Sequence, residues 1–118
     1  MKVIFLDVYN KKAPQVMDID GELDTIKKLI DCERIDSIIY KVGNTPFRVI
    51  VDDDGYFRKN YIISAYSPRY LYPLVGNLVI FGKENYEGDL TSLSDKLAER
   101  ILRRFEQDAD GYYCLYAD

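Results

Sequence analysis

Strand-like patterns of apolar and polar residues fill most of the first half of the chain. Residues 1–9 form a largely apolar run, and residues 15–19 alternate polar with apolar side chains after a turn that contains Pro14. We expect these two segments to form a hairpin. Residues 35–42 and 47–52 are two further β-rich runs, and the turn cluster between them indicates a second hairpin.

Two segments carry apolar residues at the spacing of an amphipathic helix. The first covers residues 22–31, with Asp20 placed as its N-cap. The second covers residues 93–107 and follows Ser92, which forms a capping-box pattern with Asp95. The buried stripes expected for the two helices are Leu23, Ile26, Leu29 and Ile30 in the first, and Leu93, Leu97, Ile101 and Phe105 in the second.

Shorter signals place the remaining elements. The Asp-Asp-Gly turn at residues 53–55 leads into two aromatic residues and predicts another hairpin. Residues 61–63 have the composition of a short strand, although the prolines at 68 and 73 favour loop geometry around them. Residues 78–81 form a strand between two glycines, and residues 112–116 suit either a last edge strand or a packed tail. These elements together predict an α+β fold, with a mixed, mostly antiparallel sheet and two helices packed on it.

Length and composition are those of one globular domain. The chain has 118 residues, of which 47% are apolar and 14% aromatic, so we expect residues 1–118 to form a single domain with one core. The longest apolar stretch, residues 74–81, is far shorter than the ~20 residues of a membrane span. Residues 1–7 do not build the apolar region of a signal peptide. We therefore expect a cytoplasmic protein that does not enter a membrane.

The residue content disfavours several kinds of chemistry. Histidine is absent, which removes the commonest general base and the commonest transition-metal ligand. Cys32 and Cys114 are too few for a disulfide framework, and we expect two reduced, partly buried thiols. The acidic clusters at residues 18–24 and 52–54 are explained by helix capping and by a turn. We expect no metal site, no cofactor and no catalytic residue.

The middle of the chain differs in charge from the rest. The whole chain has a net charge of −4, yet residues 55–83 contain four basic residues and no acidic residue. This segment is also rich in tyrosine, and aromatic rings beside cations suit the stacking of nucleic-acid bases or the anchoring of a protein partner. The alternative is that half of these tyrosines belong to the core. The candidate binding residues are Arg58, Lys59, Tyr61, Arg69, Tyr70 and Tyr72.

Two stretches in the second half carry a resemblance to a known family. They are residues 70–82, from Tyr-Leu-Tyr-Pro to Ile-Phe-Gly, and the Gly-Asp-Leu-Thr-Ser-Leu-Ser-Asp motif at residues 88–95. With the Ile-Asp-Gly step at residues 19–21, the chain resembles an uncharacterised family of small proteins from phages, conjugative elements and Firmicutes, known as a domain of unknown function. Residues 64–69 depart from the family pattern. The family has no established activity, so the resemblance assigns no catalytic residue.

Three functions are compatible with these observations. The resemblance implies an accessory protein of a phage or mobile genetic element, a setting that includes inhibitors of host defence. We therefore expect a non-enzymatic binding protein that acts by contact with a protein partner. The alternative is a nucleic-acid-binding module that uses residues 56–72, which the acidic net charge disfavours because Lys and Arg supply most affinity for phosphates. A small enzyme that depends on carboxylates alone is the third hypothesis.

Overall fold

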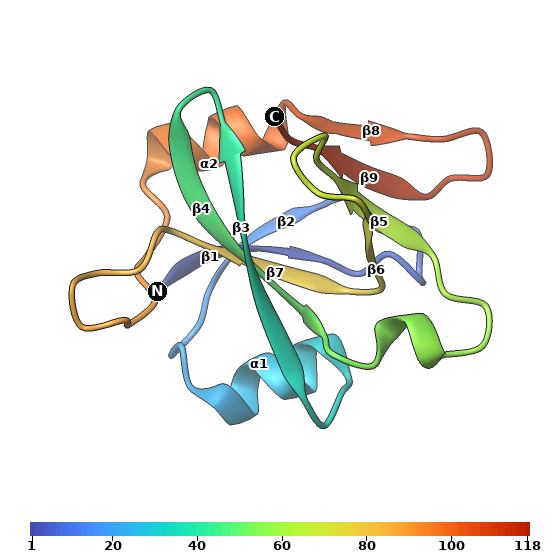
Figure 1. Ribbon diagram of the computed structural model, residues 1–118, viewed down its shortest axis with the longest axis horizontal. Helices are drawn as coiled ribbons and strands as arrows, with labels where there is room; N and C mark the ends of the chain where they lie inside the picture. The colour runs from blue at the N-terminus through green and yellow to red at the C-terminus, as the bar shows by residue number, and fades with distance from the viewer.

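The main sheet has five strands, and every neighbouring pair in it is antiparallel. The computed structural model describes all residues from 1 to 118 (Figure 1). Both expected hairpins of the first half form in this sheet, so local patterning predicted them correctly. In spatial order the strands are β2 (Gln15–Asp18), β1 (Lys2–Leu6), β7 (Leu78–Phe81), β4 (Thr45–Asp52) and β3 (Ile35–Val42).

A second sheet contains the other four strands. Its only parallel pair is β5 with β9, whereas the other two pairs are antiparallel. The expected α+β fold with mostly antiparallel strands is therefore confirmed, but the strands divide between two sheets instead of joining one. In spatial order they are β6 (Leu74–Val75), β5 (Ile63–Tyr66), β9 (Tyr113–Tyr116) and β8 (Phe105–Gln107).

The main sheet is covered on both faces. Helix α1 (Leu23–Ile30) packs Ile26 and Ile30 against one face. The other face packs against the second sheet and against helix α2 (Asp95–Leu102), whose buried residues include Leu97 and Ile101. The two helices lie at opposite ends of the molecule (Figure 1). The central strands of the main sheet therefore read as nearly continuous apolar runs, because both of their faces are buried.

The second helix is shorter than its apolar pattern predicts. It ends at Leu102, and Phe105 belongs to strand β8, where it lies opposite Leu115. Both a helix and a strand would turn Phe105 toward the core, so the i, i+4 spacing alone does not separate the two conformations. The pairing of β8 with β9 decides in favour of the strand.

The helix N-termini also differ in detail from the expected caps. Ser94, not Ser92, is the N-cap of α2, and its hydroxyl accepts a hydrogen bond from the backbone N–H of Leu97. The Ser92 hydroxyl instead accepts from the N–H of Lys2 and so joins the helix entry to β1. Asp20 precedes the N-cap of α1 by two residues and accepts from the N–H of Glu22.

The hairpin predicted after residues 53–55 does not form. A 3₁₀ turn, η1 (Gly55–Phe57), follows β4 instead, with the N–H of Phe57 donating to the carbonyl of Asp54. Gly55 is buried, and a Cβ there would come within 2.9 Å of a Val75 methyl group. Only glycine lets the chain pass this close to β6.

Five smaller expectations also have an outcome. The short strand expected at 61–63 begins at Ile63, and β9 lies inside the second sheet instead of at its edge. Leu23, expected in the buried stripe of α1, is half-exposed. Cys32 and Cys114 are free thiols of intermediate burial, as expected. Neither α1 nor α2 has the length and the apolar content that a membrane-spanning helix requires.

Candidate functional site

Three tyrosine rings from the middle segment meet on the surface beside η1. The ring of Tyr56 lies 5.0 Å from that of Tyr61 and 6.5 Å from that of Tyr72, and both contacts are edge-to-face. The Tyr56 hydroxyl donates to the carbonyl of Pro73, which ties η1 to the start of β6. We call Tyr56, Tyr61 and Tyr72 the tyrosine cluster.

The tyrosine cluster is accessible, and further apolar side chains adjoin it in the chain. Tyr61 is 42% exposed and Tyr72 is 69% exposed. Phe57, next to Tyr56, is 88% exposed, and Leu71, next to Tyr72, is 85% exposed. Single exposed apolar residues are ordinary, but several large ones on one short segment indicate an interaction surface. Every tyrosine of the middle segment is at least 40% exposed, so the alternative that half of them belong to the core is wrong.

Tyr70 has a different role from Tyr61 and Tyr72. Its ring stacks on the ring of the fully buried Tyr40, with centroids 5.6 Å apart. Its hydroxyl donates to the carbonyl of Ile39 in β3, which is an edge strand of the main sheet. Tyr70 therefore holds the loop before β6 against the main sheet, and this contact covers part of the Tyr70 side chain.

The tyrosine pair Tyr40 and Tyr70 gives a prediction about stability. The Tyr40 hydroxyl is buried without a hydrogen-bond partner, and burial also raises the pKa of Tyr40. Tyr40→Phe removes an unpaired polar group, so we expect unchanged or higher stability, by up to about 1.5 kcal/mol. Tyr70→Phe makes the same chemical change but loses the bond to Ile39, so we expect a loss of about 1 kcal/mol. Urea unfolding of both variants measures the difference, and a large loss for Tyr40→Phe would contradict the assignment.

Arg58 is engaged within the protein. Its guanidinium pairs with the carboxylate of Asp52, whose side chain is only 6% exposed, and donates to the carbonyl of Asp31 at 3.3 Å. The hydrogen bond to Asp52 raises the pKa of Arg58. Lys59, in contrast, is exposed and forms no ion pair. Lys59 is thus the cation of the loop after η1 that forms no ion pair.

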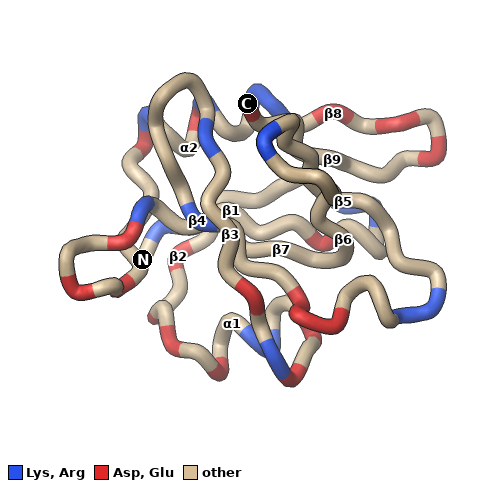
Figure 2. The backbone as a smooth tube through the Cα atoms, viewed as in Figure 1, with Lys and Arg blue, Asp and Glu red and all other residues tan.

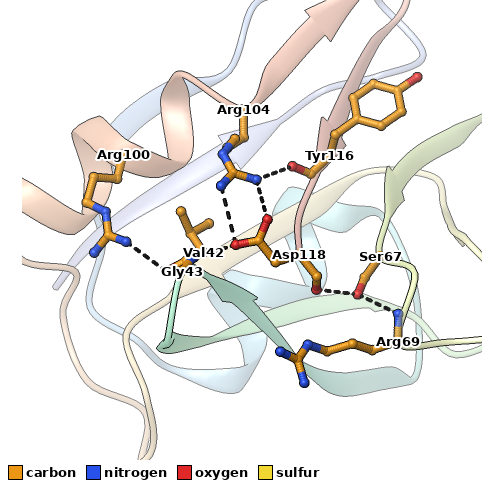
Figure 3. A network of polar contacts seen from close by, with 8 residues as sticks. All are labelled: Val42, Gly43, Ser67, Arg69, Arg100, Arg104, Tyr116 and Asp118. Atoms are coloured by element: carbon orange, nitrogen blue, oxygen red, sulfur yellow. Dashed lines mark hydrogen bonds and ion pairs between the residues drawn. The ribbon is translucent and has the colours of Figure 1, made fainter.

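Arg69 lies in a separate network around Asp118 (Figure 3). The Asp118 carboxylate pairs with Arg104 at 2.7 Å and accepts from the N–H of Gly43 in the β3–β4 turn. The Ser67 hydroxyl donates to the main-chain oxygen of Asp118 and accepts from the N–H of Arg69. This network holds together the end of α2, the β3–β4 turn and the loop that carries Arg69.

The basic residues of the middle segment therefore do not form one patch. Figure 2 shows them divided between the loop after η1, which contains Arg58 and Lys59, and the loop between β5 and β6, which contains Arg69. Lys83 follows β7 in a third place. Of the six candidate residues, the structure brings Tyr61 and Tyr72 together through their shared contact with Tyr56. Lys59 lines a cavity that also contains Asp31 and Asp52, and Arg58, Arg69 and Tyr70 have surroundings of their own.

The Asp118 network predicts a pH-dependent contribution to stability. The hydrogen bonds from Arg104 and from the Gly43 N–H lower the pKa of Asp118 below its ordinary value of 3.8. A carboxylate with a lowered folded-state pKa stabilises the fold above its unfolded pKa, and the contribution is lost as the pH falls through the folded pKa. We expect Asp118→Asn to melt at a lower temperature than the wild type at pH 7, and the gap to close toward pH 3. A gap that stays constant across this range would contradict the assignment.

A polar cleft lies between the end of α1 and η1. It has a volume of about 710 Å³ and is lined by residues that include Lys27, Cys32, Phe57 and Arg58. A smaller cavity of about 220 Å³ shares Arg58 with it and reaches Asp52. Burial, followed by the charge of Asp52, raises the pKa of the Cys32 thiol, which disfavours the reactive thiolate. This cleft offers charged walls but no activated nucleophile.

The side chains of this fold form no evident metal-binding site. No group of three or more Asp, Glu or Cys side chains converges in a way that could hold an ion. The acidic residues instead spread over the periphery, including α1, the loop before α2 and the β8–β9 hairpin (Figure 2). The expectation that the protein needs no metal stays a prediction.

The selection of candidate residues from the sequence was incomplete. It omitted Tyr56, which joins the other two rings of the tyrosine cluster, and the highly exposed Phe57 and Leu71. A signal for Leu71 was present, since it lies between two tyrosines just before Pro73 in a loop. The central position of Tyr56 had no local signal, because η1 and Tyr72 meet only in the folded chain.

Comparison with known proteins agrees with the resemblance in one respect, that the chain belongs to an uncharacterised family. No curated protein and no solved structure matches the chain. One family does match, and it covers residues 1–106, from β1 into β8. The match includes the whole tyrosine cluster and most of the chain. The chain therefore belongs to the family described as domain of unknown function DUF3846.

Proposed function

We propose that this chain is a non-enzymatic binding protein that recognises another protein through the tyrosine cluster and the adjacent Phe57 and Leu71. The observation that carries the proposal is the contact of three exposed tyrosine rings on one short segment, flanked by two almost fully exposed apolar side chains. Tyrosine is enriched among the residues that dominate binding energy at protein interfaces. It supplies a large apolar area and a polar hydroxyl, with few torsions to immobilise.

The hydrogen bonds that anchor the loops of the tyrosine cluster support the same proposal. Tyr56 is bonded to Pro73, and the loop that bears Tyr72 is fastened through Tyr70 to β3 and through Ser67 to Asp118. The first of these bonds joins η1 to the residue before β6, and the other two connect the segment to strand β3 and to Asp118, which several partners hold. A surface that is already ordered loses less conformational entropy on binding than a flexible loop does. The exposed rings are therefore presented by a stiff support.

The biological setting that we propose is a phage or another mobile genetic element. The resemblance of the chain to small proteins of phages, conjugative elements and Firmicutes supports this setting. Within it, the protein serves as a cytoplasmic accessory factor, and a component of a host defence system is the partner that would make it an inhibitor. Inhibition by contact requires a binding surface and no catalytic group. The tyrosine cluster would be that binding surface.

Nucleic-acid binding is the competing function for the same rings. Aromatic side chains stack on bases without sequence preference, but affinity also needs cations that neutralise phosphates. In the chain between Tyr56 and Tyr61, Arg58 already pairs with Asp52, which leaves Lys59 as the one cation without an ion pair. The local charge therefore favours a protein partner.

Capture of the partner from a lysate of the bacterial host tests the proposal. We expect wild-type protein to retain a defined host protein, and the double variant Tyr61→Ala/Tyr72→Ala to lose it, with a cost of about 2 kcal/mol or more, roughly 30-fold in affinity. Tyr86→Ala is the matched control, because Tyr86 is fully exposed in the loop between β7 and α2. Equal capture by the double variant, with its fold intact by circular dichroism, would refute the proposal.

A further inference from the structure

The cavity of about 220 Å³ beside the polar cleft is lined by charged groups of both signs. We propose that this cavity binds the backbone of a free α-amino acid, whose side chain extends into the cleft. The site is separate from the tyrosine cluster, because none of those three rings lines the cavity or the cleft. Three features support the proposal: the place of the cavity in the fold, the balance of its charges, and the hydrogen-bonding groups that have no partner within the protein.

Separate parts of the chain build the cavity at one end of the main sheet. Its lining includes Tyr9 after β1, Asp31 at the end of α1, Asp52 at the end of β4 and Asn77 between β6 and β7. The ends of β1 and β4 lie level with the start of β7 in the strand pairing, so the fold itself brings these residues together. The volume corresponds to roughly seven water molecules at about 30 Å³ each, which suits a ligand much smaller than a drug.

The charges that line the cavity balance. Its carboxylates are Asp31 and Asp52, and its cations are Arg58 and Lys59. Arg58 and Asp52 pair with each other, whereas Lys59 and Asp31 form no ion pair within the protein. A ligand with a single charge would match one of these two groups and repel the other, but a zwitterion matches both. The ammonium group of the ligand at Asp31 would also lie at the C-terminal end of α1, where the helix dipole favours a cation.

The hydrogen-bonding groups without partners match the two ends of an amino acid. Asn77 Oδ1 accepts from the backbone N–H of Val8, which leaves Nδ2 as the unpartnered donor of that amide. Arg58 donates through Nε to Asp52 and through Nη2 to the carbonyl of Asp31, which leaves Nη1. These donors suit a carboxylate, which only accepts. The carboxylate of Asp31 suits an ammonium group, which only donates.

The polar cleft provides room for the side chain of the ligand. It shares Asp31 and Arg58 with the cavity and has a volume of about 710 Å³. The highly exposed ring of Phe57 lines it, as do Lys27 and Glu33. Such a wall accepts apolar, basic and acidic side chains alike. We therefore expect the ammonium and carboxylate groups to contribute most of the affinity, and several amino acids to bind.

Titration of the ¹⁵N-labelled full chain with single amino acids tests the proposal by NMR. The probes are L-phenylalanine, L-glutamine and L-arginine, and we expect saturable shifts confined to residues 30–33, 52–59 and 76–78. N-acetyl-L-phenylalanine lacks the ammonium group, and L-phenylalanine amide lacks the carboxylate. Each should bind roughly tenfold more weakly than L-phenylalanine, because each loses one charged hydrogen-bonding end.

Two conservative variants assign the two ends of the ligand. Asp31→Asn removes the carboxylate, and asparagine tolerates the left-handed backbone of this residue, with a φ of 63°. Asn77→Asp keeps the acceptor for the Val8 N–H and replaces the donor with an anionic oxygen. Each variant should bind L-phenylalanine roughly tenfold more weakly than the wild type. Asp31→Asn should bind the acetylated derivative no more weakly, and Asn77→Asp should bind the amide no more weakly. The Tyr61→Ala/Tyr72→Ala protein should bind like the wild type.

The contrary results are equally distinct. Absence of saturable binding by all three amino acids overturns the proposal, and so does binding of both derivatives as tightly as L-phenylalanine. Wild-type affinity in both Asp31→Asn and Asn77→Asp overturns it as well. Tighter binding of inorganic phosphate or adenosine monophosphate at these residues overturns it in favour of an anion site. None of these results bears on the proposed function, because capture of a host protein depends on the tyrosine cluster.

Discussion

Ile101→Asp is expected to cost several kcal/mol of folding free energy, enough to unfold much of the protein at room temperature. Ile101 is completely buried in α2, within the core between the helix, the main sheet and the second sheet. A carboxylate at this position would have no cation in the apolar surroundings. Natural domains have only about 5–15 kcal/mol of stability in total, so one such change removes a large part of it.

Urea unfolding of the variant beside a surface control provides the measurement. Lys96→Asp is the control, since Lys96 is exposed in the first turn of the same helix, where an acidic residue is favoured by the helix dipole. We expect that control to stay within about 0.5 kcal/mol of the wild type. An Ile101→Asp protein as stable as the Lys96→Asp protein would show that α2 does not pack on the sheet as described.

Arg58→Ala is expected to destabilise the fold by about 1–3 kcal/mol, because it leaves the buried carboxylate of Asp52 without its cation. The value lies below that of a fully enclosed pair, since half of the Arg58 side chain is in water. The Asp52 carboxylate also accepts from the N–H of Asp54, so part of its environment survives. Arg58 thus stabilises the turn from β4 into η1, whatever it adds to binding.

A double-mutant cycle measures the interaction energy between Arg58 and Asp52 separately from the contacts that each makes with other residues. Asp52→Asn and Arg58→Ala are measured singly and together, and we expect the combined loss to be smaller than the two single losses added. Lys59→Ala, one residue along and free of ion pairs, should leave stability within about 0.5 kcal/mol of the wild type. Strict additivity of the two changes would mean that Arg58 and Asp52 do not interact.

The parts of the fold that the sequence predicts well are those decided locally. The β-rich run at residues 35–42 and the apolar run at 78–81 match β3 and β7 residue for residue. The apolar pattern does not distinguish a helix from a strand where both conformations bury the same side chain. Phe105 is inward in either a helix or a strand, and pairing with Leu115 makes it a strand. The division into two sheets depends on contacts between distant segments, such as the parallel pair β5–β9, which no local pattern encodes.

For the candidate site too, residue composition predicted one part, and contacts between residues distant in the chain decided the rest. Charge and tyrosine content set the segment apart from the rest of the chain, with Tyr61 and Tyr72 among its residues, but left open whether its tyrosines were exposed or in the core. They could not show that Arg58 is paired with Asp52, because the two side chains meet only once η1 has formed in place of a hairpin. They also could not show that Tyr70 is tied to Ile39, which lies 31 residues earlier in the chain.

Photo-crosslinking tests the central claim, that the tyrosine cluster is the surface that meets the partner, most directly. A photoreactive phenylalanine analogue replaces Tyr72 in one protein and Tyr86 in another, and both are irradiated in host cells. Both positions are exposed, but they lie in separate loops. We predict one defined crosslinked protein from position 72, lost when Tyr61→Ala is added, and none from position 86. Equal crosslinking from both positions, or a defined product from position 86 alone, would contradict the account.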